Sequence, residues 1–456
     1  MSKTIQSINP ATEEVITAYQ LADESEIDRA LERADTAFRS WRRTPVQERQ
    51  KCTRRLATVL RERKTELSKV ITSEMGKPIA EAEAEIEKCA WNCETYAEIG
   101  ADLLANKPAP SAASESYVQF LPLGPILAIM PWNFPFWQVF RFAAPAVVAG
   151  NTVILKHASN VPGCSQSIAE TFQEAGFPEG VFQSILVPGS AASRLIGDRR
   201  IAAVTLTGSN LAGSQAAAAA GAAIKKTVLE LGGSDPFIIL EDADLESAVT
   251  TGVKSRFQNT GQSCIAAKRF IVVEKIFSTF ADRFAEAVAA LKTGQPMERE
   301  TQIGPLARKD LREGIEKQVE ESVALGAQVL VGGQRLPGKG YFYKPTVLTD
   351  VTPTLPAGCE EVFGPVAALM RVRDDEEAIA LANNSPFGLG SSLWTRDLDK
   401  ARRLAREIEA GQVFINGMVA SDPRLPFGGV KESGYGRELS EFGIREFVNI
   451  QTVWIK

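Results

Sequence analysis

Apolar residues recur at helical spacing through the N-terminal part of the chain. Between Ser25 and Trp41 they occupy one face of a helix, at steps of three and four residues. The same spacing predicts a second helix over about residues 46–74 and a third over about residues 79–103, with a break at residues 76–78. The pattern therefore predicts that the N-terminal hundred residues are helical.

From residue 126 onward, short apolar runs alternate with alanine-rich segments of helical length. We predict strands at residues 126–130, 152–155, 182–187, 203–206, 237–240, 270–273, 328–331 and 366–371. We predict helices at residues 137–149, 164–175, 191–197 and 211–223. Strands separated by helices are typical of a parallel sheet with helices on both faces, so we predict an α/β, doubly wound fold.

The segments that flank this region have different patterns. Residues 107–114 are rich in proline, alanine and serine, which predicts a loop, and residues 116–123 alternate like a strand. The tail at residues 448–455 is also predicted to be a strand. It is a candidate for pairing with a partner subunit.

The composition narrows the class of protein. With 456 residues, the chain is long enough for two or three domains, and its 44% apolar and 23% charged residues are ordinary values for a globular protein. A net charge of −5 without a long basic run disfavours a nucleic-acid partner. We expect no signal peptide, because residues 1–15 contain no apolar stretch of the kind that one needs. We expect no membrane span, because the most apolar segment, residues 142–155, is short and is broken by Pro145 and Gly150. Six scattered cysteines predict no disulfide framework, which fits a reducing cytoplasm.

The histidine content constrains any catalytic mechanism. The chain has one histidine, His157. A serine-histidine-aspartate hydrolase or a histidine-rich metal site would have to be built on that residue alone. We therefore expect a carboxylate to do the acid-base chemistry and a nucleophile to act without a histidine partner.

Two glycine-containing segments follow predicted strands. Residues 207–213 open an alanine-rich helix, whose N-terminus could bind a phosphate, although an ordinary strand-to-helix turn would have the same sequence. Glu230 stands at the end of an apolar stretch, just before Gly232 and Gly233. A carboxylate that faces a cleft there would have a raised pKa and could act as a general base, whereas a solvated glutamate would only cap the element.

A candidate nucleophile follows small polar residues. Cys264 is predicted to stand at the start of a helix, where the helix dipole would favour its thiolate. The alternative is a buried structural cysteine, which is the interpretation for the remaining five, Cys52, Cys89, Cys93, Cys164 and Cys359. Cys89 and Cys93 lie one helical turn apart, but no further cysteine or histidine is nearby in the sequence to complete a metal site, so we predict no metal.

An amide side chain is bounded by two prolines. Asn133 lies between Pro131 and Pro135 after a predicted strand. Held rigidly, its amide could donate to a developing oxyanion; the alternative is a proline-bounded turn.

Seven segments together resemble the aldehyde dehydrogenase superfamily, in its order and rough spacing. They are residues 131–135, Lys156, and residues 207–213, 230–233, 261–264, 361–365 and 426–437. The resemblance implies that Cys264 attacks an aldehyde, that Asn133 and the Cys264 backbone N–H hold the oxyanion, and that Glu230 activates the water that hydrolyses the thioester. It implies a dinucleotide site formed by Trp132, Lys156, Ser159, Gly208, Ser209, Leu231, Glu361 and Phe363. The presence of Glu230 favours hydrolysis over acyl transfer to coenzyme A.

The resemblance also bears on the choice of cofactor. NAD-preferring relatives commonly carry a glutamate three residues after the lysine, where this chain has Ser159 after Lys156. A small hydroxyl does not repel a 2′-phosphate, and Lys156 would attract one. We therefore predict a preference for NADP, with NAD as a possible second cofactor.

Within the superfamily, the chain resembles short bacterial succinate-semialdehyde dehydrogenases. The resemblance implies that Arg141 and Ser421 bind the substrate carboxylate and that Trp137 lines the pocket; the alternative for Arg141 is a surface ion pair. Where longer relatives have a second arginine, this chain has Gln258, with Arg256 displaced by two residues, and the sequence leaves open which of them replaces it. Ala266 stands where some relatives carry a second cysteine, so that redox switch is absent.

The predicted function is NADP-preferring oxidation of succinate semialdehyde to succinate. Alternatives are oxidation of glutarate semialdehyde or an aliphatic aldehyde, a non-catalytic member of the fold, and a thiol hydrolase without a cofactor. We expect a cofactor-binding domain at residues 1–104 and 123–230, a catalytic domain at residues 231–425, and an oligomerisation extension at residues 105–122 and 443–456. The resemblance implies a homodimer or homotetramer with its active site at the interdomain cleft.

Overall fold

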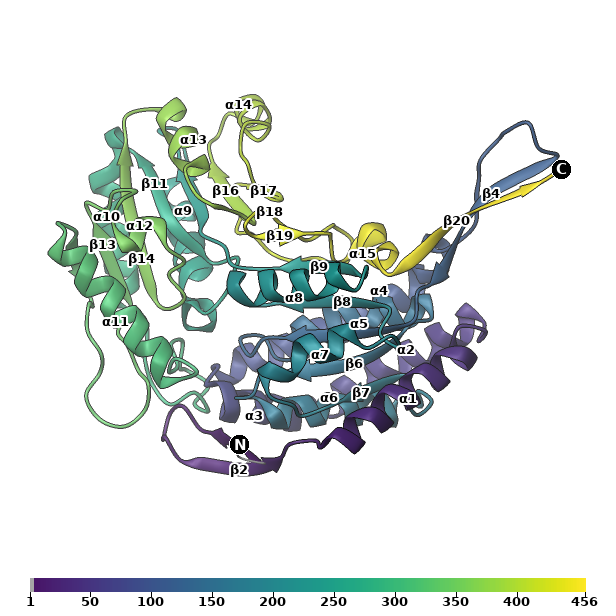
Figure 1. Ribbon diagram of the computed structural model, residues 1–456. Coiled ribbons are helices and arrows are strands. Elements are labelled where there is room, and N and C mark those ends of the chain that lie inside the picture. Colours follow the sequence, from purple (N-terminus) through teal and green to yellow (C-terminus); the bar gives the residue numbers. More distant parts are fainter. Residues whose placement is uncertain (1–3) are drawn as a thin grey trace.

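The computed structural model describes residues 4–456 and has two α/β bodies and one projecting arm (Figure 1). The first body is built on a six-stranded sheet with the strand order β19-β9-β8-β5-β6-β7. Its strands are β5 (Pro125–Met130), β6 (Thr152–His157), β7 (Phe182–Ser184), β8 (Ala203–Thr207), β9 (Lys226–Glu230) and β19 (Gly434–Tyr435). All neighbours are parallel except β19, which runs antiparallel to β9.

Helices cover both faces of this sheet. They are α1 (Glu24–Trp41), α2 (Val46–Glu62), α3 (Lys64–Met75), α4 (Ile79–Leu103), α5 (Trp137–Ala149), α6 (Pro162–Glu174), α7 (Ala192–Gly197) and α8 (Asn210–Ala222). Ile126 and Ala128 of β5 pack into a core with α2–α6, whereas Leu127, between them, packs with α1, α7 and α8. Successive side chains of a strand point to opposite faces, so this alternation shows a doubly wound layer.

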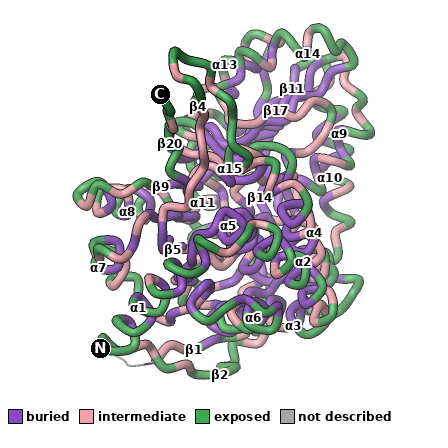
Figure 2. Tube along the Cα trace, turned by 90° about the vertical axis from the view of Figure 1, so that its right-hand side faces the viewer, coloured by how far each residue is buried: buried purple, intermediate pink, exposed green. Residues whose placement is uncertain are grey.

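The second body contains a seven-stranded sheet with the order β12-β13-β14-β11-β10-β16-β17. Its strands are β10 (Asp235–Ile239), β11 (Ala267–Val273), β12 (Gln328–Val331), β13 (Thr346–Thr349), β14 (Val366–Val372), β16 (Gly390–Trp394) and β17 (Gln412–Ile415). Its helices are α9 (Leu245–Phe257), α10 (Glu274–Ala289), α11 (Lys309–Ala324), α12 (Pro356–Cys359), α13 (Asp375–Asn383) and α14 (Leu398–Leu404). Phe237 packs with α9 and α10, and Ile238 packs with α13 and α14, so this sheet is also covered on both faces. The buried residues gather along both sheets in Figure 2.

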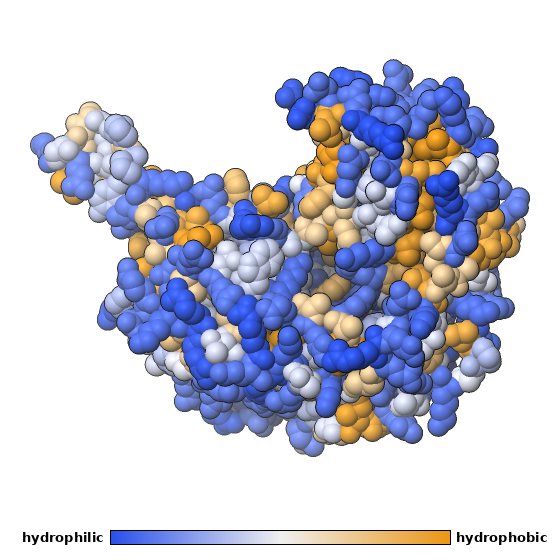
Figure 3. Space-filling view, turned by 180° about the vertical axis from the view of Figure 1, so that it is seen from behind, coloured by the Kyte–Doolittle hydropathy of each residue, from blue (hydrophilic) through white to orange (hydrophobic). Residues whose placement is uncertain are grey.

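An arm of three antiparallel strands stands clear of both bodies (Figure 3). It consists of β3 (Lys107–Pro108), β4 (Glu115–Pro122) and the tail strand β20 (Val448–Ile455). The tail strand pairs with β4 of the same chain, from Val448 opposite Pro122 to Ile455 opposite Glu115. The expectation that the tail pairs with a partner subunit is therefore wrong for that edge, and the other edge of β20 is unpaired in the described chain.

Two predictions for the N-terminal region are wrong. The described residues begin not with a helix but with an antiparallel hairpin of β1 (Thr4–Ile8) and β2 (Val15–Gln20). These strands are short and mostly solvent-exposed and therefore lack a strong apolar alternation. The helix predicted over residues 46–74 is two helices, because the chain breaks at Arg63, which ends α2 and precedes α3. The prediction of an α/β, doubly wound fold is confirmed. The proposed division into domains follows these sheets and stays a proposal.

The remaining elements are short. They are the 3-10 turns η1 (Gly189–Ala191) and η2 (Gln258–Gly261), the paired strands β15 (Phe387–Gly388) and β18 (Val430–Lys431), and α15 (Ser440–Glu446). Across residues 4–456, no helix has the length and apolar character needed to cross a membrane.

Candidate active site

Two cavities meet at Cys264. The α4–α5 cavity, of about 350 Å³, is lined by Glu81, Ala84, Glu85, Lys88, Phe134, Trp137, Gln138, Arg141, Lys254, Gln258, Ser263, Cys264, Ile265, Ser421 and Phe427. The switch-point cavity, of about 400 Å³, is lined by Met130, Pro131, Trp132, Asn133, Gln138, Lys156, Ala158, Thr207, Gly208, Ser209, Leu231, Gly232, Cys264, Arg308, Leu311, Glu361 and Phe363. Cys264 and Gln138 belong to both sets, so a ligand in either cavity can reach the thiol.

The second cavity lies where the six-stranded sheet reverses its strand order. The chain runs from β5 to β6 and β7 on one side, and then returns to β8 and β9 on the other. Loops that follow the carboxyl ends of β5 and β8 therefore diverge and leave a crevice, which is where ligands bind in open α/β sheets. Trp132 and Asn133 come from the loop after β5, and Gly208 and Ser209 come from the loop after β8.

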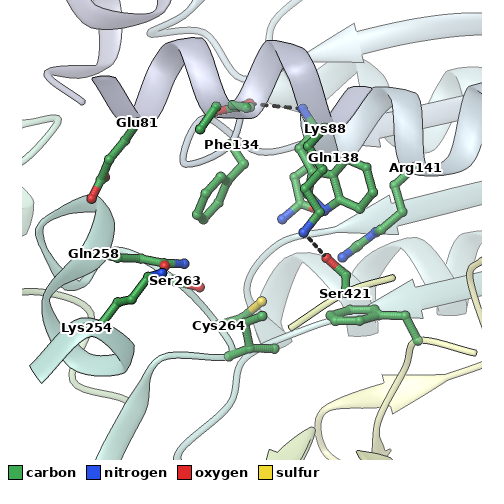
Figure 4. Close-up of a pocket in the computed structure, with 15 residues that line it drawn as sticks. Glu81, Lys88, Phe134, Gln138, Arg141, Lys254, Gln258, Ser263, Cys264 and Ser421 are labelled. Carbon is green, nitrogen blue, oxygen red and sulfur yellow. Dashed lines mark hydrogen bonds between the residues drawn. The ribbon is translucent and has the colours of Figure 1, made fainter. Parts of the chain in front are cut away.

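Cys264 lies in a turn between η2 and β11, not at the start of a helix as predicted. A helix dipole therefore does not favour its thiolate. Burial raises the pKa of the Cys264 thiol to about 12, while the charges of Arg141 and Lys268 lower it. Figure 4 shows the sulfur pointing into the α4–α5 cavity.

The turn before Cys264 is held in an unusual backbone conformation. Asn259 and Thr260 both have a φ of 55°, and Gly261 has a φ of 71°. A side chain on Gly261 would also meet the Gly364 carbonyl, at 2.3 Å, so glycine is required there. Glu81 accepts a hydrogen bond from the Asn259 backbone N–H at 2.7 Å, and this pins the turn to α4.

Asn133 is buried directly against this turn. Its Nδ2 donates to the Gln262 backbone carbonyl at 3.1 Å, and the Asn133 backbone carbonyl accepts from Asn259 Nδ2 at 2.8 Å. An amide nitrogen has two protons, so one remains for a ligand beside Cys264. The geometry fits a rigid donor, as the sequence predicts, but the role itself stays a proposal.

Glu230 is not placed on either cavity. It ends β9, and neither of its carboxylate oxygens has a hydrogen-bond partner in the described chain. One oxygen, Oε1, lies so close to Gly428 that a Cβ there would be 2.8 Å from it. Burial raises the pKa of Glu230 well above its usual range; the Arg141 charge opposes this shift and the Glu438 charge adds to it. The carboxyl group must therefore turn toward Cys264 before it can act there.

Lys268 connects the nucleophile turn to Glu361, and sequence reasoning missed it. Its Nζ donates to the Cys264 carbonyl at 2.7 Å and to the Ser263 carbonyl at 2.9 Å. It also forms an ion pair with Glu361 Oε1 at 3.6 Å, and the Gly233 N–H donates to that same oxygen at 2.9 Å. One buried ammonium thus fixes Cys264 and Glu361 relative to each other.

The switch-point cavity has polar groups suited to an anionic dinucleotide. Lys156 is half-buried on its wall and forms no ion pair within residues 4–456, and Thr207 Oγ1 is buried without a partner. Ser209 caps α8, whose N-terminus opens on the cavity. Trp132 and Phe363 pack edge to face, 5.8 Å apart, at the other side. These residues fit a nicotinamide dinucleotide.

Ser159 is not among the residues that line this cavity. It lies exposed in the turn after β6, one residue beyond Ala158, which does line the cavity.

The single histidine is close by but structural. His157 bonds to the Pro135 carbonyl at 2.9 Å, and burial lowers the pKa of its imidazole to about 4. It therefore ties β6 to the Asn133 loop as a neutral ring.

The α4–α5 cavity brings together the predicted substrate-binding residues. Arg141 is buried with its charge paired to Glu438, and its Nη2 has no hydrogen-bond partner. It is therefore not a surface ion pair. Trp137 and Ser421 line the same cavity, and Figure 4 shows Ser421 beside the Arg141 guanidinium.

Of the two candidates for the second carboxylate contact, Arg256 and Gln258, only Gln258 lines the cavity. Arg256 is fully buried away from the cavity, where it donates to the carbonyls of Gly261 and Gly364 at 2.6 and 2.9 Å. Gln258 does line the cavity. A third residue, Lys88, also lines it and was not found from the sequence.

No group of three or more histidine, cysteine, aspartate or glutamate side chains in residues 4–456 is arranged to hold a metal ion.

The family is decided by comparison with known proteins. The model of the aldehyde dehydrogenase family matches residues 1–453. The chain belongs to the aldehyde dehydrogenase family. The predictions of this family and of an aldehyde dehydrogenase enzyme are therefore confirmed.

Relatives of this aldehyde dehydrogenase extend over its whole length. It is 52% identical to a succinate semialdehyde dehydrogenase [NAD(P)+] of Escherichia coli, over 98% of this chain and 97% of that one. It is 51% identical to succinate-semialdehyde dehydrogenase [NADP(+)] 1 of Mycobacterium tuberculosis, over 99% of both chains. A solved succinic semialdehyde dehydrogenase from Streptococcus pyogenes, in complex with NADP+, superposes with a TM-score of 0.97 at 37% identity, over 99% of both chains.

Proposed function

We propose that this enzyme oxidises succinate semialdehyde to succinate and prefers NADP. The observation that carries the proposal is that Arg141, whose buried Nη2 has no hydrogen-bond partner, lines the same cavity as Cys264 and Ser421. A guanidinium binds a carboxylate in preference to an uncharged group, so an aldehyde with a distal carboxylate fits this cavity. The names of the two enzymes at 51–52% identity support the same substrate.

The proposed chemistry uses Cys264, Asn133 and Glu230. The Cys264 thiol first loses its proton to solvent. Attack of the resulting thiolate on the aldehyde carbon gives a thiohemiacetal, whose oxyanion is held by the free Asn133 amide proton and by the Cys264 N–H. When bound, the nicotinamide supplies the hydride acceptor. Loss of hydride from the former aldehyde carbon leaves a thioester. Glu230 then takes a proton from water, the hydroxide attacks the thioester carbonyl, and the Cys264 thiolate leaves with release of the acid.

The switch-point cavity is proposed to hold the dinucleotide. Glu361, fixed by Lys268 and by the Gly233 N–H, would bind a ribose, and Lys156 would attract a phosphate. We also propose a cytoplasmic enzyme, which agrees with six free cysteines in the described residues. A homodimer or homotetramer is proposed, with the unpaired edge of β20 as a contact, because an exposed strand edge is ready to pair.

Arg141→Ala tests the substrate proposal. Loss of a buried charged contact costs about 2–5 kcal/mol, so kcat/KM for succinate semialdehyde should fall at least about 30-fold. Oxidation of butanal, which has no carboxylate, should fall much less, because it loses only the effect of the Arg141 charge on the pKa values of Cys264 and Glu230. Residual butanal oxidation shows that the variant is folded. Initial rates of NADP reduction with both aldehydes measure the ratio. Equal losses for the two aldehydes would contradict a carboxylate contact at Arg141.

The cofactor preference is tested at Ser159. The wild-type enzyme should have a higher kcat/KM with NADP than with NAD, because the exposed hydroxyl leaves room for a 2′-phosphate. Ser159→Glu places a carboxylate there and should lower kcat/KM for NADP at least about 10-fold while NAD is unaffected or improved. Ser159→Ala, which removes the hydroxyl without adding charge, is the matched control. The proposal fails if wild-type efficiency with NAD equals or exceeds that with NADP.

A further inference from the structure

Lys88 reaches into the α4–α5 cavity from the middle of α4. Its Nζ donates a hydrogen bond to Ser421 Oγ at 2.7 Å and lies 4.4 Å from the centre of the Trp137 ring. Figure 4 shows Lys88, Ser421 and the Arg141 guanidinium gathered on one side of the cavity, with the Cys264 sulfur directed toward them. Three segments that are distant in sequence therefore place hydrogen-bond donors around one point.

The charges at this point are not balanced. Arg141 has Glu438 as its partner. Lys88 forms no ion pair with any carboxylate in residues 4–456, and Ser421 takes only one of its three protons. Half-burial and the nearby Arg141 charge lower the pKa of Lys88 to about 8. A desolvated cation without a counter-ion is unfavourable, and an anion bound beside Lys88 would offset that cost.

We propose that Lys88 binds the distal carboxylate of the aldehyde substrate together with Arg141. The inference rests on the proposed function and adds the second cationic contact, which the sequence leaves between Arg256 and Gln258. A carboxylate has two oxygens: one faces the Arg141 guanidinium and the other faces the Lys88 ammonium. The substrate is therefore a short aldehyde acid.

The surroundings of Lys88 favour a ligand contact over a purely structural one. A structural lysine in a protein interior is normally satisfied by a carboxylate or by several carbonyls, as Lys268 is by Ser263, Cys264 and Glu361. Lys88 has instead one hydroxyl and the face of Trp137. The indole face holds an ammonium in position without neutralising its charge. The cation therefore remains available to an anion.

Lys88→Met, which keeps the length but removes the charge, tests the inference. With saturating NADP, KM for succinate semialdehyde should rise at least about 10-fold with little change in kcat, because a contact made equally to substrate and transition state affects binding alone. Butanal kinetics should be unchanged. Lys88→Arg should restore most of the selectivity for the acidic aldehyde. Succinate, used as an inhibitor of butanal oxidation, should lose affinity in Lys88→Met by the same factor.

The pH profile supplies a readout that a structural role would not change. Lys88 is charged below its pKa, so kcat/KM for succinate semialdehyde relative to butanal should fall as the pH rises through about 8. The groups that face Lys88 are Arg141 from α5, Asp422 from the Ser421 loop, and Glu85 and Cys89 on α4 itself. Dividing kcat/KM for succinate semialdehyde by kcat/KM for butanal removes the pH dependence of the chemical step, which both substrates share. The fall should be absent in Lys88→Met.

A second cavity cation provides the matched control. Lys254 lines the opposite side of the cavity in Figure 4 and is solvent-exposed, so Lys254→Met should change the selectivity less than about 2-fold. An equal loss of selectivity in Lys254→Met would overturn the proposed Lys88–carboxylate contact. The selectivity would then come from the overall positive charge of the cavity. Unchanged selectivity in Lys88→Met, with wild-type preference intact, would overturn the role of Lys88 alone. A wild-type enzyme without preference for the acidic aldehyde would overturn the proposed function itself.

Discussion

Replacement of Cys264 by alanine is expected to lower the rate of aldehyde oxidation at least about 10³-fold, because no other group can form the covalent intermediate. Cys264 is the one sulfur on both cavities, and the other described cysteines lie elsewhere, three of them fully buried. The measurement is the initial rate of NADP reduction with succinate semialdehyde, monitored by absorbance.

The matched control is Cys359→Ala, since Cys359 is exposed and lines neither cavity. It should retain wild-type activity, and iodoacetamide should still inactivate it. Cys264→Ala that keeps more than a small fraction of the wild-type rate would contradict the assignment of the nucleophile. Dinucleotide binding to Cys264→Ala, followed by quenching of tryptophan fluorescence, should persist and show that the fold is intact.

Glu230→Gln is expected to separate the two halves of the reaction. Glutamine cannot take a proton from water, so steady turnover should fall by about 10²–10⁴-fold. The first turnover should still release about one reduced cofactor per active site as the thioester accumulates. Rapid mixing with NADP and succinate semialdehyde measures both phases. Unchanged steady turnover would contradict the role of Glu230 as the base.

The acidity of Glu230 adds a pH dependence to this prediction. The base must be ionised, and burial raises the pKa of Glu230 well above its usual value. Wild-type steady turnover should therefore be lost as the pH falls through that raised pKa, and the burst of Glu230→Gln should lack this limb. Glu360→Gln, a substitution of an exposed carboxylate, should leave both phases unchanged.

The sequence was sufficient for the elements with strong periodicity. The limits of α5 at Trp137 and Ala149 and of the tail strand at Val448 and Ile455 agree with the structure, because these segments are bounded by residues that change the pattern sharply. The β1–β2 hairpin was missed because its strands pack little apolar surface. The break at Arg63 was missed because apolar spacing continues across it.

Residues of the site were predicted only where they belong to a sequence motif. Cys264 lines the same cavities as Asn133 and Arg141, but it lies in a turn and not at the start of a helix as predicted. Lys88 and Lys268 could not be found in this way. Which face of α4 meets a cavity, and which buried lysine meets a carbonyl, depend on packing between segments far apart in the chain.

The C-terminal strands have a consequence for how the molecule is made. β19 extends the first sheet beside β9, and β20 pairs with β4, although both strands come after the entire second body. During synthesis, residues 4–230 emerge from the ribosome long before β19 and β20 are made. The first body must therefore wait with open edges through the synthesis of the second, and such edges are prone to wrong pairing. Removal of β19 and β20 would thus leave strands β9 and β4, which are synthesised earlier, without a neighbour on one edge.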